Sequence, residues 1–133
     1  MSAPPVAMPD AVAIGCGYLR AALLARGTTA PVGTRVPDPR PIRFVRIERL
    51  PGVQLTVVHD RPRLDVHCWG ADEADAAALA AECRAILGAA RGTFGATVLA
   101  RPRTGGPGWL PDPVSGQARY AFTWDITLRG TPL

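Results

Sequence analysis

The hydrophobic pattern of the chain changes abruptly at Gly70, and this change restricts the fold more than any other feature. Before it, Leu64, Val66 and Cys68 alternate with polar residues, the period of two that marks a strand with one buried face. After it, apolar residues recur at helical spacing, at Leu79, Cys83, Ile86, Leu87 and Ala90. A strand that leads directly into an amphipathic helix predicts a sheet with a helix packed on one of its faces.

Start and stop signals predict two helices, at 10–26 and 72–91. The first begins after Pro9-Asp10 and ends at Gly27. The second has acidic residues in its first turn and Gly92 just beyond its end, an order that complements the helix dipole. We expect the first helix, weakened by two interior glycines, to bury the stripe formed by Ile14, Tyr18, Ala22 and Leu23.

The other periodic segments predict strands at 42–50, 54–60, 63–69, 97–100 and 119–129. The first two are expected to form a hairpin around the turn Leu50-Pro51-Gly52, and the chain should turn again at 59–62. The last is predicted to be a central core strand, because its alternate residues are large and apolar: Tyr120, Phe122, Trp124, Ile126 and Leu128.

Two segments rich in proline and glycine, 27–41 and 101–117, have no hydrophobic period and are expected to be irregular arms. The whole sequence therefore predicts one α+β domain over 1–133. Its mostly antiparallel sheet carries two packed helices, and the two arms extend from this body.

Residues that suit catalysis are few. Asp65 and His67 share a strand face two positions apart, but two ligands make no metal site without a third from elsewhere, so a surface or interface pair is the simpler interpretation. Ser115 lies outside any nucleophile elbow, and the glycines at 105–108 lack the lysine of a phosphate-binding loop. We therefore expect no catalytic residue, no metal, no cofactor and no enzymatic activity.

The three cysteines, Cys16, Cys68 and Cys83, are far apart and include no C-x-x-C pair. This spacing favours neither a zinc site nor a disulfide framework. Cys68 and Cys83 fall on apolar faces, where a free thiol behaves as a small hydrophobe in a reducing compartment. No apolar run approaches the roughly 18 residues of a membrane span, so we expect no membrane contact.

All 15 basic residues are arginine, and the formal net charge is +4. The positive charge is spread along the chain, with Arg43, Arg46 and Arg49 on one predicted strand, rather than gathered into a dense basic stripe. A small basic nucleic-acid-binding domain is one alternative. Against it, the aromatic residues mostly belong to one buried face and offer no platform for stacking bases.

Two stretches resemble the tail terminator proteins of long-tailed phages that infect actinobacteria, which are similar to the lambda-type tail terminator family. The first is DRPRLDVHCWGADEADAAALAAECRAIL at 60–87, which resembles the family's strand and alanine-rich helix. The second is RPRTGGPGWLPDPVSGQARYAFTWDITLRG at 101–130, which resembles the segment leading into the family's last strand. The resemblance covers 44–129.

The resemblance implies a structural virion protein at the head-proximal end of the tail, assembled in the host cytoplasm. Such a protein forms a ring, by resemblance a hexamer, that caps the tail tube, stops its polymerisation and offers a surface for head–tail joining. Its partners would be its own copies, the major tail tube protein and the head–tail connector or neck proteins. Genomic DNA would pass through the lumen without sequence-specific binding. A head-completion or neck protein is the alternative within this class.

The two arms are expected to reach neighbouring subunits, because heterologous contacts close a ring. Aromatic and arginine side chains dominate interface energetics, so Trp109 is expected to contribute most. For Trp109, the alternative is that it folds back over the domain's own core edge. The candidate interface residues are Arg35, Arg40, Arg101, Arg103, Trp109 and Leu110.

Overall fold

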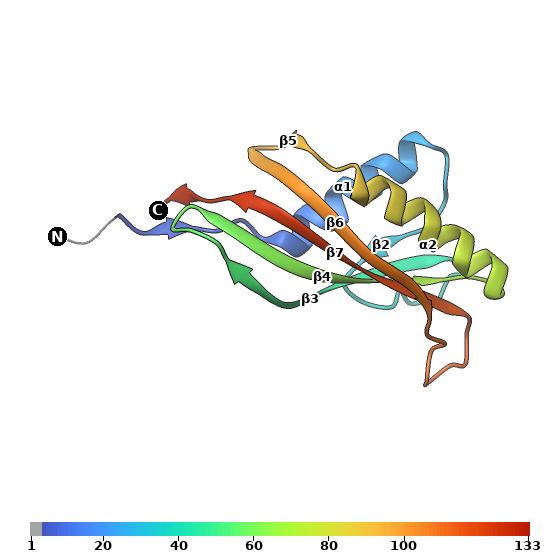
Figure 1. The fold of residues 1–133 in the computed structure, drawn as a ribbon. Coiled ribbons are helices and arrows are strands. Elements are labelled where there is room, and N and C mark those ends of the chain that lie inside the picture. Colours follow the sequence, from blue (N-terminus) through green and yellow to red (C-terminus); the bar gives the residue numbers. More distant parts are fainter. Residues whose placement is uncertain (1–3) are drawn as a thin grey trace.

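The computed structural model describes residues 4–133, in which both helices lie on one face of a six-stranded sheet (Figure 1). The strand order is β2-β3-β4-β7-β6-β5, and every neighbouring pair is antiparallel except β2 and β3. A separate short ribbon pairs β1 with β8. This arrangement confirms the predicted α+β architecture with a mostly antiparallel sheet. In chain order the elements are β1 (Val6–Ala7), α1 (Ala11–Ala25), β2 (Val32–Gly33), β3 (Phe44–Gln54), β4 (His59–Trp69), α2 (Glu73–Gly88), β5 (Gly92–Phe94), β6 (Thr97–Trp109), β7 (Arg119–Arg129) and β8 (Thr131–Pro132).

Both predicted helices are confirmed, and each starts at an aspartate cap. The Asp10 carboxylate accepts hydrogen bonds from the backbone N–H groups of Val12 and Ala13 at the start of α1. The Asp72 carboxylate accepts one from the backbone N–H of Asp75 at 2.8 Å. Such caps satisfy backbone donors that have no partner within the helix.

The buried side of α1 differs from the predicted stripe. Gly15 is buried, and a Cβ atom there would lie 3.2 Å from the side chains of Leu64 and Trp124, so the missing side chain lets the helix approach the sheet closely. Gly15, which was expected to weaken the helix, is therefore the position at which the helix packs against the sheet. Of the predicted stripe only Leu23 is fully buried, and three members are partly exposed: Ile14, Tyr18 and Ala22.

The hairpin of β3 and β4 turns at 55–58, and the prediction of a turn at 50–52 was wrong. β3 continues to Gln54, and its register with β4 shifts between Leu50 and Val53, so Pro51-Gly52 forms a bulge. A Cβ atom on Gly52 would lie 2.5 Å from the Arg61 carbonyl oxygen, so the close approach of the two strands needs glycine. The corner predicted at 59–62 likewise lies inside β4.

The segment 101–117 is not irregular throughout, because β6 continues as far as Trp109. Its pairing with β7 shifts register twice, at Pro102 and at Pro107. Proline lacks the N–H that a regular ladder needs, and a bulge accommodates it. The first half of the predicted arm, 101–109, is therefore a bulged strand, and only 110–118 is a loop. The other segment, 27–41, is irregular apart from β2.

The core strand was predicted correctly: β7 lies between β4 and β6. Its inward-facing side chains from Phe122 to Leu128 are at most 2% exposed, and Tyr120 is partly buried. The Trp124 indole N–H also donates a hydrogen bond to the Leu87 carbonyl oxygen in α2 at 2.9 Å. One side chain thereby joins the sheet to both helices.

All three cysteines are free and buried. Cys68 of β4 and Cys83 of α2 are both completely buried, as their apolar faces predicted. The hydrogen bond with Cys83, together with burial, raises the pKa of the Cys68 thiol well above its ordinary value. A raised pKa suppresses the reactive thiolate, so Cys68 is a packing residue.

We predict that Trp124→Ala lowers the free energy of unfolding by about 3 to 5 kcal/mol, because it removes a buried aromatic ring together with its hydrogen bond to the Leu87 carbonyl. Urea denaturation followed by circular dichroism measures the loss. The control is Val114→Ala, at a side chain that is 95% exposed, which should stay within about 0.5 kcal/mol of wild type. Equal stabilities of the two variants would show that the core is wrongly placed.

Candidate functional site

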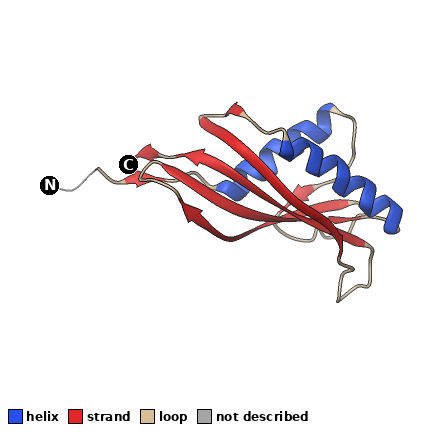
Figure 2. Ribbon diagram, in the orientation of Figure 1, coloured by secondary structure: helices blue, strands red, loops and turns tan. Residues whose placement is uncertain are grey.

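The sheet face opposite the helices carries no helix in the described chain, 4–133, as Figure 2 shows. We call it the open face. Antiparallel sheets commonly solvate one face in this way, and strand alternation places mainly polar or charged side chains on it. On the central strands they include Arg46, Glu48, Arg63, Asp65, His67, Thr123, Asp125 and Thr127.

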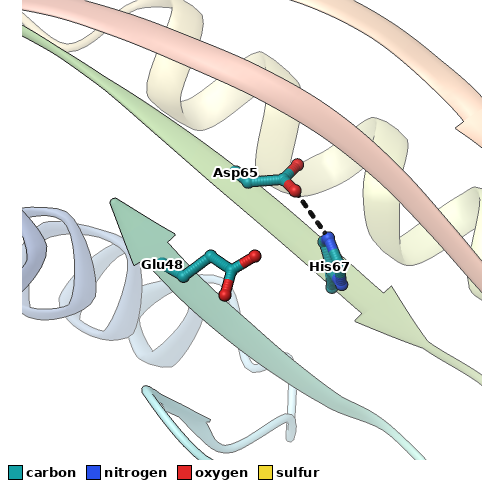
Figure 3. Close-up of side chains that lie close together, drawn as sticks. All are labelled: Glu48, Asp65 and His67. Carbon is teal, nitrogen blue, oxygen red and sulfur yellow. Dashed lines mark hydrogen bonds and ion pairs between the residues drawn. The ribbon is translucent and has the colours of Figure 1, made fainter. Parts of the chain in front are cut away.

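Glu48, Asp65 and His67 form a cluster on the open face (Figure 3). One ligand-type atom from each lies within 4.8 Å of the other two. Glu48 of β3 is directly opposite Asp65 of β4, and His67 Nε2 lies 2.8 Å from an Asp65 carboxylate oxygen. The sequence interpretation paired Asp65 with His67 correctly and missed the third member.

Arg46 determines which nitrogen of His67 carries the proton. An Arg46 guanidinium N–H lies 3.3 Å from His67 Nδ1, and a guanidinium group can only donate, so Nδ1 must accept. The proton of the neutral ring is then on Nε2, where it is donated to Asp65. Both ring nitrogens are occupied, so His67 offers no free lone pair to a metal ion or to a substrate proton. Arg46, His67 and Asp65 therefore form a hydrogen-bonded chain across β3 and β4, and Glu48 lies beside it, opposite Asp65.

We predict that His67 is the Nε2–H tautomer in the neutral ring. Long-range ¹H–¹⁵N spectra of the folded protein distinguish the two tautomers, and His59, whose Nδ1 lies 3.0 Å from the Thr56 hydroxyl, serves as an internal reference. A proton on Nδ1 of His67 would contradict the assigned role of Arg46.

The second polar centre is the buried carboxylate of Asp112 in the loop after β6. It accepts hydrogen bonds from the Trp69 indole N–H at 3.0 Å, from Arg40 at 2.9 Å and from the backbone N–H groups of Val114 and Ser115. Burial alone raises the pKa of this carboxyl, but these four donors outweigh it and hold the pKa of Asp112 well below its ordinary value.

This network ties the two predicted arms to each other and to the sheet. Arg40 reaches Gln117 as well as Asp112, and its guanidinium group stacks 5.2 Å from the centre of the Phe44 ring. Phe44 in turn stacks on Trp69 at 4.4 Å. Arg40, predicted as an interface residue, is thus engaged within its own subunit.

We predict that Asp112→Asn lowers the free energy of unfolding at pH 7 by about 2 kcal/mol, because hydrogen bonds to a charged acceptor are lost. Since the folded pKa is depressed, the stabilisation is present above the ordinary carboxyl pKa of about 3.9 and disappears as the pH falls below it. Denaturation curves between pH 3 and pH 8 should show the gap between wild type and variant closing in acid. The control, Asp38→Asn, changes an exposed aspartate in the neighbouring segment. A gap that stays constant would refute the role given to Asp112.

A groove crosses the open face beside the tip of the β3–β4 hairpin. Three adjoining hollows form it, and Leu55 lines all three. Its apolar part comes from Leu55, Val98 and Ala100, and five arginines surround it, with Asp125 as the one carboxylate among the lining residues. We call this surface the arginine groove. Its arginines are Arg61, Arg63, Arg101, Arg103 and Arg129.

The structure does not bring the six candidate interface residues together. Arg101 and Arg103 are exposed in the first half of β6 and line the arginine groove. Trp109 and Leu110 lie at the far end of the same strand, 46% and 47% exposed. Arg35 is exposed in the segment after β2, near Arg40 in the chain. The Trp109 ring lies 5.4 Å from the ring of Tyr120, which packs against the core, so Trp109 covers part of the core edge while 46% of it stays exposed.

No model of a known protein family matches this chain, and a comparison with curated proteins gives no match. Within residues 4–133, neither helix has the length and apolar character that crossing a bilayer requires. The function must therefore be argued from the surfaces themselves.

Proposed function

We propose that this chain is a structural virion protein that caps the tail tube of a long-tailed phage as a homo-oligomeric ring. The observation that carries the proposal is that large apolar side chains are exposed at two separate ends of one rigid sheet. At one end are Val53, Leu55 and Val57, between 48% and 63% exposed, and at the other are Trp109 and Leu110. Two different exposed apolar surfaces suit head-to-tail assembly, which forms a ring when the rotation between neighbouring subunits closes. The sequence resemblance at 60–87 and 101–130 is the support for placing that ring on a tail.

The irregular segments fit this role in a modified form. The Asp112 network locks 110–118 against the segment before β3, so the loop is a pre-formed surface rather than a free arm. A pre-formed surface loses less conformational freedom on binding, which favours association. In the proposed particle, one ring face contacts the last tube subunits and the other receives the head–tail connector, while genomic DNA passes through the lumen. A six-fold ring is the expectation from the resemblance.

We predict that a phage lacking this chain accumulates overlong tail tubes together with tailless heads. The physical reason is that the subunit that normally occupies the growing end is missing, so tube protein continues to add. Electron microscopy of lysates measures both tube length and head–tail joining. Supplying the wild-type gene in trans is the control and should restore a single tube length.

The same experiment separates the alternatives. Tails of normal length that fail to join heads would indicate a neck or head-completion protein. Normal virions would contradict any essential place in tail assembly.

A further inference from the structure

We propose that the arginine groove of one subunit receives the opposite end of a second copy of this chain. The inserted surface consists of Trp109 and Leu110 with the first turn of α2, Asp72 and Glu73. We call it the α2 end. The proposal rests on the proposed ring and identifies the contact that closes it.

The groove has unused positive charge. Arg63 is paired with Asp125 through two hydrogen bonds of 2.9 and 3.2 Å, and Arg61 donates to the Arg101 carbonyl and the Thr127 hydroxyl. Among the described residues, the guanidinium groups of the other three groove arginines, Arg101, Arg103 and Arg129, have no hydrogen-bonding partner. Three free cations beside an aliphatic floor fit a partner that offers carboxylates next to apolar side chains.

The α2 end offers that combination. The Trp109 ring lies 5.4 Å from the Tyr120 ring, and the Tyr120 hydroxyl donates to Glu73 at 3.2 Å, so aromatic and acidic groups are contiguous. Asp72 and Glu73 are both exposed, whereas Asp75, one turn further, is already neutralised by Arg43. Exposed carboxylates therefore adjoin an exposed indole.

The two surfaces are at opposite ends of the molecule. The groove lies beside the β3–β4 hairpin tip, and the α2 end lies where β6 finishes and α2 begins (Figure 1). Along β6, Arg101 and Trp109 are separated by roughly 25 Å, at about 3.3 Å per residue. Because the two surfaces differ and lie apart, their contact is heterologous, so each copy uses one surface on each neighbour. Repeating such a contact forms a ring when the rotation between neighbours closes, and the proposed ring requires that closure.

A nucleic-acid backbone is the competing occupant for a basic groove. The floor of the groove is aliphatic, at Leu55, Val98 and Ala100, and its lining includes no Phe, Tyr or Trp. The one aromatic ring among the lining residues is the imidazole of His59, which is hydrogen-bonded to Thr56. Binders of single strands use aromatic rings to stack bases. The groove chemistry therefore favours a protein surface.

Complementation between two disabled variants tests the proposal. The groove variant is Arg101→Glu/Arg103→Glu, and the end variant is Trp109→Ala/Glu73→Gln. Each should weaken self-association by roughly tenfold or more, because each lacks one half of the contact. Mixed in equal amounts, they should form a dimer of twice the 14.0 kDa chain mass that does not grow further, since each copy retains one functional surface. Sedimentation velocity measures the masses.

The control is Arg84→Glu/Arg91→Glu, which makes the same charge change at exposed positions outside both surfaces and should self-associate like wild type. Circular dichroism verifies folding, and Arg101→Gln/Arg103→Gln and Leu110→Ala/Glu73→Gln replace any variant that fails to fold. A mixture that stays monomeric, or single variants that still assemble, would overturn the proposal. So would a groove variant that loses affinity for a DNA oligonucleotide but assembles normally.

The proposed function can fail separately. A wild-type chain that assembles through this contact but does not limit tube length would refute tube capping and leave the contact intact. A chain that limits tube length while the mixed variants stay monomeric would refute the contact alone.

Discussion

The packing of Trp124 is the constraint on which the rest of the structure depends. Its ring lies against Gly15 of α1, and its indole N–H donates to Leu87 of α2, so one buried residue of β7 fixes both helices on one sheet face. With both helices there, the opposite face is left open. The sheet also extends beyond the helices at the β3–β4 hairpin end, where one of the two proposed assembly surfaces lies (Figure 1).

Bulges let a long sheet carry different surfaces at its two ends. β6 passes Pro102 and Pro107 without ending, which separates the arginine groove from Trp109 along a single strand. The Asp112 carboxylate then holds the loop after β6 against the sheet through the Trp69 and Arg40 hydrogen bonds. Charge and apolar surface are thus presented in fixed positions, which a ring of identical subunits requires.

Hydrophobic periodicity and capping residues were enough to predict both helices, the core strand and the burial of Cys68 and Cys83. The predictions of a turn at 50–52 and of an irregular arm at 101–109 were wrong. Both rested on proline and glycine, which occur in turns and in β-bulges alike, and pairing with the neighbouring strand decides which of the two forms. The wrong turn also shifted the hairpin register, which hid Glu48 opposite Asp65. Exposure of Trp109 and the partners of Asp112 depend on tertiary contacts between distant segments, so no local pattern could predict them.

The measurement that tests the account most directly is electron microscopy of purified tail tubes incubated with this chain carrying a gold label. Tube capping by a ring predicts label at one end of each tube and an arrest of further growth when tube protein is added. Label along the tube walls, or tubes that keep growing from the labelled end, would contradict it.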